Sequence, residues 1–198
     1  MAGASLVTTR PHRPASVCCV SGHSVLQLPV PELEEWVRRR HAHYDDGFVS
    51  ADPRFGHAHV TVLGPFDPAP PAATCAVLAG IARDTPPVVV RLARLAQFPD
   101  GIIHLVPEPD LDVRALTARL VAAFPQWPPY AGVHGPTPQP HLTLDAASAG
   151  VGAEVDLATT ADLLGDLVPV DVVLDRLQLA WWESGDCRVL AEWRLGVG

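Results

Sequence analysis

Two four-residue stretches decide the fold: HVTV at positions 59–62 and HLTL at positions 141–144. In a β-strand, successive side chains point to opposite faces, and residues two apart lie roughly 6.5–7 Å from each other on one face. The histidine and the threonine of each stretch are therefore expected on the same face, while the aliphatic residues point to the other face, into a core. The polar face carries His59, Thr61, His141 and Thr143.

The sequence around these two stretches repeats. An apolar run at 25–28 is followed by Val-Pro-Glu at 30–32, a helical pattern, a loop and the first stretch. Another apolar run at 102–105 is followed by Val-Pro-Glu at 106–108, a second helical pattern, a loop and the second stretch. The order strand, helix, strand predicts a duplicated unit with two lobes related by a pseudo-two-fold axis. Such an axis lets the two polar faces meet across a groove.

The rest of the chain supplies further helices and strands to this repeat. Amphipathic patterns predict helices, and β-branched or apolar runs bounded by glycine and proline predict strands. We expect residues 1–15 to form a loose arm and residues 16–198 to form one bilobal domain. The predicted helices cover 31–40, 72–83, 110–124 and 156–167, and the predicted strands cover 24–28, 59–63, 88–95, 101–106, 141–144, 170–182 and 188–195, the last two as a hairpin.

Two histidines and two threonines around one small volume suit phosphoryl transfer. An imidazole titrates near ~6.5, so one histidine can be neutral and take a proton while the other is charged and gives one. Each threonine hydroxyl can donate a hydrogen bond to a phosphate oxygen on which charge develops. This chemistry needs no metal. One such stretch alone would indicate a core histidine beside a strand threonine, whereas two at matching places of a repeat favour a site.

The paired stretches resemble the H-x-T-x motifs of the 2H phosphoesterase superfamily, within the bacterial 2′-5′ RNA ligase and cyclic phosphodiesterase group. The resemblance covers about residues 22–195 and includes the Pro-Glu helix before the first motif, the Gly-Pro-Phe exit at 64–66, and Pro140 before the second motif. It implies a bilobal α+β fold, with two antiparallel sheets, helices outside them, and a central V-shaped cleft.

The resemblance also implies the class of reaction. Members of the superfamily open 2′,3′-cyclic phosphates or ADP-ribose 1″,2″-cyclic phosphate, trim RNA ends, and join or cleave 2′-5′ linkages. In them, one motif histidine acts as the base on water or a ribose hydroxyl, and the other protonates the leaving oxygen. Here the sequence alone leaves both assignments of His59 and His141 open.

Composition restricts the partners. The formal net charge is −8, which argues against a protein that coats long nucleic acid, because such binding needs many cationic contacts. The chain contains no lysine, which excludes a lysyl-adenylate ligase mechanism. The four cysteines, at positions 18, 19, 75 and 187, lack C-x-x-C spacing, so neither a disulfide framework nor a zinc site is expected. No signal peptide or membrane-spanning run is visible, which favours a cytoplasmic protein.

Further side chains near the motifs are candidates for binding substrate. Tyr130, Phe66 and Trp182 can stack a base, with core packing as the alternative for each. Arg54 can clamp a phosphate. His134 can reach the substrate from the loop before the second motif, or simply be solvated. No metal ligand is predicted: His57 and His59 form a His-x-His pair, but no third ligand has fitting spacing.

These features predict a monomeric, metal-independent phosphodiesterase that needs no cofactor and contacts no membrane. Its substrate would be a small 2′,3′-cyclic phosphate or a related nucleotide ester, with RNA ends as further partners. One alternative is a 2′-5′ RNA ligase or RNA-end processing enzyme. Another is a protein that binds nucleotides or RNA ends in the same cleft without turnover, and a third is a biosynthetic or defence enzyme that acts on an unusual ester.

Overall fold

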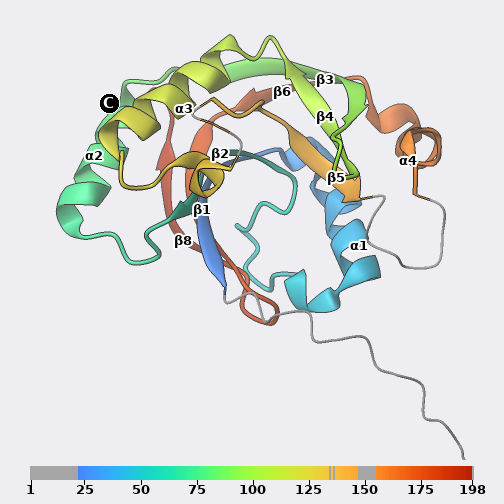
Figure 1. The fold of residues 1–198 in the computed structure, drawn as a ribbon, viewed down its shortest axis with the longest axis horizontal. Helices are drawn as coiled ribbons and strands as arrows, with labels where there is room; N and C mark the ends of the chain where they lie inside the picture. The colour runs from blue at the N-terminus through green and yellow to red at the C-terminus, as the bar shows by residue number, and fades with distance from the viewer. Residues whose placement is uncertain (1–21, 134, 136, 147–154, 198) are drawn as a thin grey trace, which may run out of the picture.

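Helices are interspersed among the strands in this computed structural model, which describes residues 22–133, 135, 137–146 and 155–197 (Figure 1). The strands are β1 (His23–Pro29), β2 (His59–Phe66), β3 (Val88–Gln97), β4 (Ile102–Glu108), β5 (Leu142–Ala146), β6 (Val170–Leu174), β7 (Arg176–Trp182) and β8 (Arg188–Arg194). The α-helices are α1 (Glu34–Tyr44), α2 (Ala72–Arg83), α3 (Leu111–Ala123) and α4 (Leu157–Leu164). The arm expected at residues 1–15 and the candidate His134 lie outside the described residues.

All strands of the described chain join one antiparallel sheet in the order β6-β3-β4-β5-β2-β1-β7-β8. Figure 1 shows that this sheet is strongly curled. The two expected antiparallel sheets are its halves, β6-β3-β4-β5 and β2-β1-β7-β8. The halves join where Val60 of β2 pairs with Leu142 of β5. The motif strands are therefore neighbours at the centre of the molecule.

The register confirms the predicted duplication. β1 lies beside β2 as β4 lies beside β5. Within these pairs, Gln27 is opposite Thr61, and His104 is opposite Thr143. Each motif threonine thus has a buried polar neighbour at the same place of its half. The pseudo-two-fold axis passes between the two motif strands.

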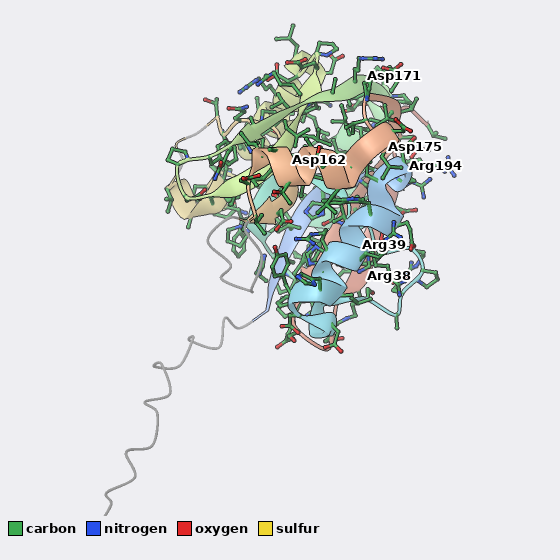
Figure 2. The ribbon with its side chains drawn as sticks, turned by 90° about the vertical axis from the view of Figure 1, so that its right-hand side faces the viewer. Arg38, Arg39, Asp162, Asp171, Asp175 and Arg194 are labelled. Carbon is green, nitrogen blue, oxygen red and sulfur yellow. The ribbon has the colours of Figure 1, made fainter. Side chains whose placement is uncertain are left out.

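The helices cross from one half to the other. α1 connects β1 to β2 but packs on β5, and α3 connects β4 to β5 but packs on β2. α1 also contacts α4: the Trp36 indole N–H donates to the Leu163 carbonyl oxygen over 3.1 Å. Figure 2 shows Arg38 and Arg39 on the outer, exposed side of α1. Each half is therefore braced by a helix that follows a strand of the other half.

The C-terminal hairpin was expected to begin with one strand over 170–182, and this prediction is wrong. The chain breaks at Asp175 into β6, which pairs with β3, and β7, which pairs with β1. Asp175 accepts from Arg176 Nε over 2.9 Å and from Arg194 over 3.4 Å, and its carbonyl oxygen accepts from the Leu195 amide. Figure 2 labels Asp175 and Arg194 at this corner. Apolar residues run on both sides of Asp175, so periodicity alone does not reveal the break.

One hydrophobic core extends through both halves. The aliphatic residues between and after the motif residues belong to it, as expected: Val60, Val62, Leu142 and Leu144 are all buried. The opposite face of the same strands is left for polar side chains. Among the described residues, no helix has the length and apolarity that crossing a bilayer requires.

Candidate active site

The central strand pair sets the arrangement of the four motif side chains. Val60 lies opposite Leu142 in an antiparallel pair, so one step along each strand places His59 opposite Thr143 and Thr61 opposite His141. Directly opposite residues have Cβ atoms about 4.5–5.5 Å apart. All four lie on the face away from the core, with the two histidines on one diagonal and the two threonines on the other.

Each motif histidine is held by the carbonyl group two residues before it. Nδ1 of His59 lies 2.8 Å from the His57 carbonyl oxygen, and Nδ1 of His141 lies 2.9 Å from that of Gln139. A carbonyl oxygen only accepts, so both Nδ1 atoms carry the hydrogen. In the neutral ring, the lone pair is then on Nε2, the nitrogen that can take a proton. Both halves use the same device to orient their histidine.

His59 is held neutral by its surroundings. Its ring packs on the Trp182 indole, with centroids 5.1 Å apart. Burial lowers the pKa of His59 to about 4; the bond to the His57 carbonyl partly opposes this, and the nearby His41 and His141 lower the pKa further. At neutral pH, His59 can therefore accept a proton.

His141 packs in a different environment. It meets the Phe98 ring edge-on at 4.9 Å and the His104 ring at 5.4 Å, while Phe98 and His104 stack at 3.9 Å. Burial lowers the pKa of His104, which favours its neutral form. The neutral ring packs against Phe98 and His141 as an aromatic side chain does.

A cavity of about 570 Å³ lies over the motif face. His59, Thr61 and Thr143 line it, and His141 lies beside Thr61. Tyr130 also lines the cavity and shares a hydrogen bond with the Thr61 side chain. Its backbone has φ 49°, a left-handed conformation that non-glycine residues rarely adopt. The loop before the second motif therefore brings the tyrosine to the threonine of the first.

A charged cluster that the sequence analysis missed lines the cavity beside α1. Asp145 follows Thr143 by two residues in β5, and both line the cavity. Its carboxylate accepts from the Tyr44 hydroxyl and pairs with the Arg40 guanidinium, and Arg40 also donates to the Tyr44 oxygen over 2.8 Å. Asp145 is buried. Its position two residues after Thr143 was the one feature of the sequence that could have identified it as a site residue. Arg40 and Tyr44 come from α1, whose placement on β5 the sequence does not show.

Trp182 lies at the cavity, as expected, but its indole is largely covered by protein. Its ring contacts His59 and Phe55, and its N–H donates to Gln27 over 3.1 Å. It therefore packs behind the histidine, and a base-stacking role stays a prediction.

Two of the substrate-binding candidates, Phe66 and Arg54, are not among the residues that line the cavity, so their role stays a prediction. Phe66 is buried in the core against Phe124 and Trp127, at centroid distances of 5.2 and 5.9 Å. Two of the three guanidinium nitrogens of Arg54, Nε and Nη2, bind the Asp52 carboxylate, at 3.1 and 2.8 Å.

The His-x-His pair does not present two ligands to a metal. His57 Nε2 accepts from the Ser50 amide over 3.0 Å, and Nδ1 donates to the Glu34 carboxylate over 2.5 Å. Both ring nitrogens are thus engaged by the protein. In the part of the chain that the structure describes, histidine, cysteine and acidic side chains do not gather into a group that could hold a metal ion.

Comparisons with known proteins agree with this geometry. A model of the 2′-5′ RNA ligase superfamily matches residues 29–186. Similar solved structures include TT0787 of Thermus thermophilus (18% identity, TM-score 0.56) and Escherichia coli LigT complexed with 3′-AMP (17%, 0.51), each covering 88% of this chain and 98% of the other. A structure described as a phosphoesterase shares 15% identity at TM-score 0.52, covering 87% and 97%. None of the curated proteins matches. The chain belongs to the 2′-5′ RNA ligase superfamily, within the 2H phosphoesterases that its paired motifs resemble.

Proposed function

We propose that this protein is a phosphodiesterase that opens the 2′,3′-cyclic phosphate of a small nucleotide, with acid and base both supplied by its own histidines. The observation that carries the proposal is the diagonal pair of His59 and His141, each anchored through Nδ1 to a carbonyl oxygen. Because both proton-transferring nitrogens and both threonine hydroxyls share one face, a single phosphate can contact all four groups.

The reaction follows from this arrangement. Neutral His59 takes a proton from water, whose oxygen bonds to phosphorus, and protonated His141 gives a proton to the ribose oxygen as its bond to phosphorus breaks. Net addition of one water yields a phosphomonoester and a free hydroxyl. Thr61 and Thr143 donate hydrogen bonds to the non-bridging oxygens, where negative charge grows. Proton exchange with solvent then restores the starting charge of both rings.

A small substrate fits the cavity and its charge. About 570 Å³ is within the usual range for small-molecule sites. The Arg40 charge is compensated by Asp145, so this wall offers hydrogen bonds to a neutral group such as a base or a sugar. LigT has been solved with 3′-AMP and with phosphate, and ligands of that kind match the proposed product.

Turnover of a substrate panel tests the proposal. We expect hydrolysis of 2′,3′-cyclic mononucleotides, retained in chelator, with a bell-shaped pH profile and a loss of at least about 10³-fold in His59→Ala or His141→Ala. His43→Ala is the control, since His43 is exposed on α1. Full activity in the double histidine variant would contradict the mechanism.

The same panel separates the alternatives. Preference for 2′-5′ dinucleotides or RNA ends would identify an RNA-end processing enzyme, and joining of ends would identify a ligase. Calorimetric binding of 3′-AMP without turnover of any ester would identify a nucleotide-binding protein. Each of these results would replace the proposed substrate.

A further inference from the structure

A carboxylate lies directly behind the first motif. Glu34, the first residue of α1, accepts from Nδ1 of His57 over 2.5 Å and from the Ala58 amide over 2.9 Å. His57 is buried, and its Nε2 accepts from the Ser50 amide, which fixes the hydrogen on Nδ1. Both carboxylate oxygens of Glu34 are therefore directed at the strand entry that precedes His59.

The two hydrogen bonds of the peptide group between His57 and Ala58 connect this carboxylate to the motif histidine. Its N–H donates to Glu34, and its C=O accepts from Nδ1–H of His59 over 2.8 Å. Hydrogen bonds in a chain polarise one another. A carboxylate that accepts a hydrogen bond from the N–H raises the electron density on the carbonyl oxygen of the same peptide group. This strengthens the hydrogen bond from His59 to that oxygen.

The second motif cannot contain this connection. His141 donates to the Gln139 carbonyl oxygen, but the next residue is Pro140. Proline has no amide hydrogen, so the peptide group that holds His141 has no N–H that could donate a hydrogen bond to a carboxylate. The pseudo-two-fold axis therefore relates two histidines with the same carbonyl anchor and different support behind it.

We propose that Glu34 is a positioning residue that acts on His59 through the peptide group between His57 and Ala58, and that it thereby makes His59 the proton acceptor of the pair. The inference rests on the proposed function. A base becomes a cation when it takes its proton, and the carboxylate favours that cation while holding the ring by Nδ1. At His141 the anchoring peptide group cannot transmit such an effect, because Pro140 has no N–H.

The charges around His59 agree with this role. Besides Glu34, the titratable groups that influence it are His41 and His141, and both oppose its protonation. Among these groups, only the carboxylate stabilises the imidazolium. Loss of its charge should therefore reduce the basicity of His59 without moving the substrate.

Glu34→Gln tests the inference, because glutamine keeps the shape but removes the charge and cannot accept both hydrogen bonds. We expect kcat on a 2′,3′-cyclic mononucleotide to fall at least about tenfold, with KM changed less than about twofold. The hydrogen-bonded Nδ1 proton of His59 should move upfield in the NMR spectrum, while that of His141 stays in place. Glu34→Asp, which keeps the charge, should lie between the two proteins in kcat.

Glu35→Gln is the matched control, since it makes the same charge change one residue along the helix, at an exposed side chain. Unchanged kcat in Glu34→Gln, an equal loss in Glu35→Gln, or equal movement of both histidine protons would overturn the inference. If Glu34→Gln does not fold, an unshifted His59 proton and unchanged kcat in Glu34→Asp would overturn it instead. The NMR measurement needs no turnover, so it decides the inference even if no cyclic phosphate is cleaved.

Discussion

His41 gives the protein an acid sensitivity that can be measured without knowing the substrate. The ring lies on the last turns of α1, 5.4 Å from the Trp182 ring and 5.8 Å from the His57 ring. Burial, with a further contribution from His57, lowers the pKa of His41 to about 4, and Glu34 opposes this only in part. The unfolded chain should titrate at an ordinary histidine value near ~6.5.

The sign and size of the effect follow from these two values. Between about pH 6.5 and 4 the unfolded state binds the proton and the folded state does not, so the free energy of unfolding falls as pH falls through this window. From about pH 7 to pH 5, one such histidine removes about 2 kcal/mol. Because the His41 ring is partly exposed, solvent screening should reduce this loss to about 1–2 kcal/mol.

Urea denaturation at about pH 7, 6 and 5 measures the effect in the wild type and in His41→Gln. The variant should lose less stability between pH 7 and 5 than the wild type, by about 1–2 kcal/mol. His43→Gln, an exposed neighbour on the same helix, should keep the wild-type dependence. If His41→Gln and the wild type show parallel dependence on pH, the lowered pKa of His41 is refuted.

Three further predictions concern the centre of the molecule and the cavity. Leu142→Ala should destabilise the protein by about 3–4 kcal/mol in urea denaturation, because this wholly buried residue joins the two halves of the sheet; a loss below about 1 kcal/mol would contradict that role. Arg40→Met should cost about 3 kcal/mol in the same assay, because it leaves the Asp145 charge buried without its cation, and no loss would show that the pair is solvated. Tyr130→Phe should lower kcat about tenfold with stability unchanged, because the Thr61 hydroxyl loses the partner that orients it; full activity would remove Tyr130 from the site.

Much of the fold could be predicted because local patterns determine it. The duplicated strand, helix and motif appear in the sheet order and register, and the helix expected at 72–83 has those bounds. The corner at Asp175 could not be predicted, because β6 and β7 are similarly apolar and only their partners differ. Which distant strands pair depends on the whole chain, and the local periodicity of apolar residues does not show it.

The site shows the same division. Spacing by two predicted the shared face of His59 and Thr61, and the same rule argues against Phe66, which follows Thr61 by an odd number of residues and points into the core. The burial of Phe66 was not foreseen, because the strand was expected to end at residue 63. The structure shows that β2 continues to residue 66. Glu34 and Arg40 lie at the site because α1 crosses to the other half, and the sequence contains no local signal for that crossing.

The corner at Asp175 affects the order in which the strands can pair during synthesis. One half of the sheet consists of β1 and β2 together with β7 and β8, so its strands come from opposite ends of the described chain. During synthesis, β1 has no partner on its outer side until β7 has left the ribosome, and the indole of Trp182 reaches His59 only then. Strand pairing over such separations is slow. The proposed activity should therefore appear only after β7 has been released, and β1 and β2 are the strands most in need of a chaperone until then.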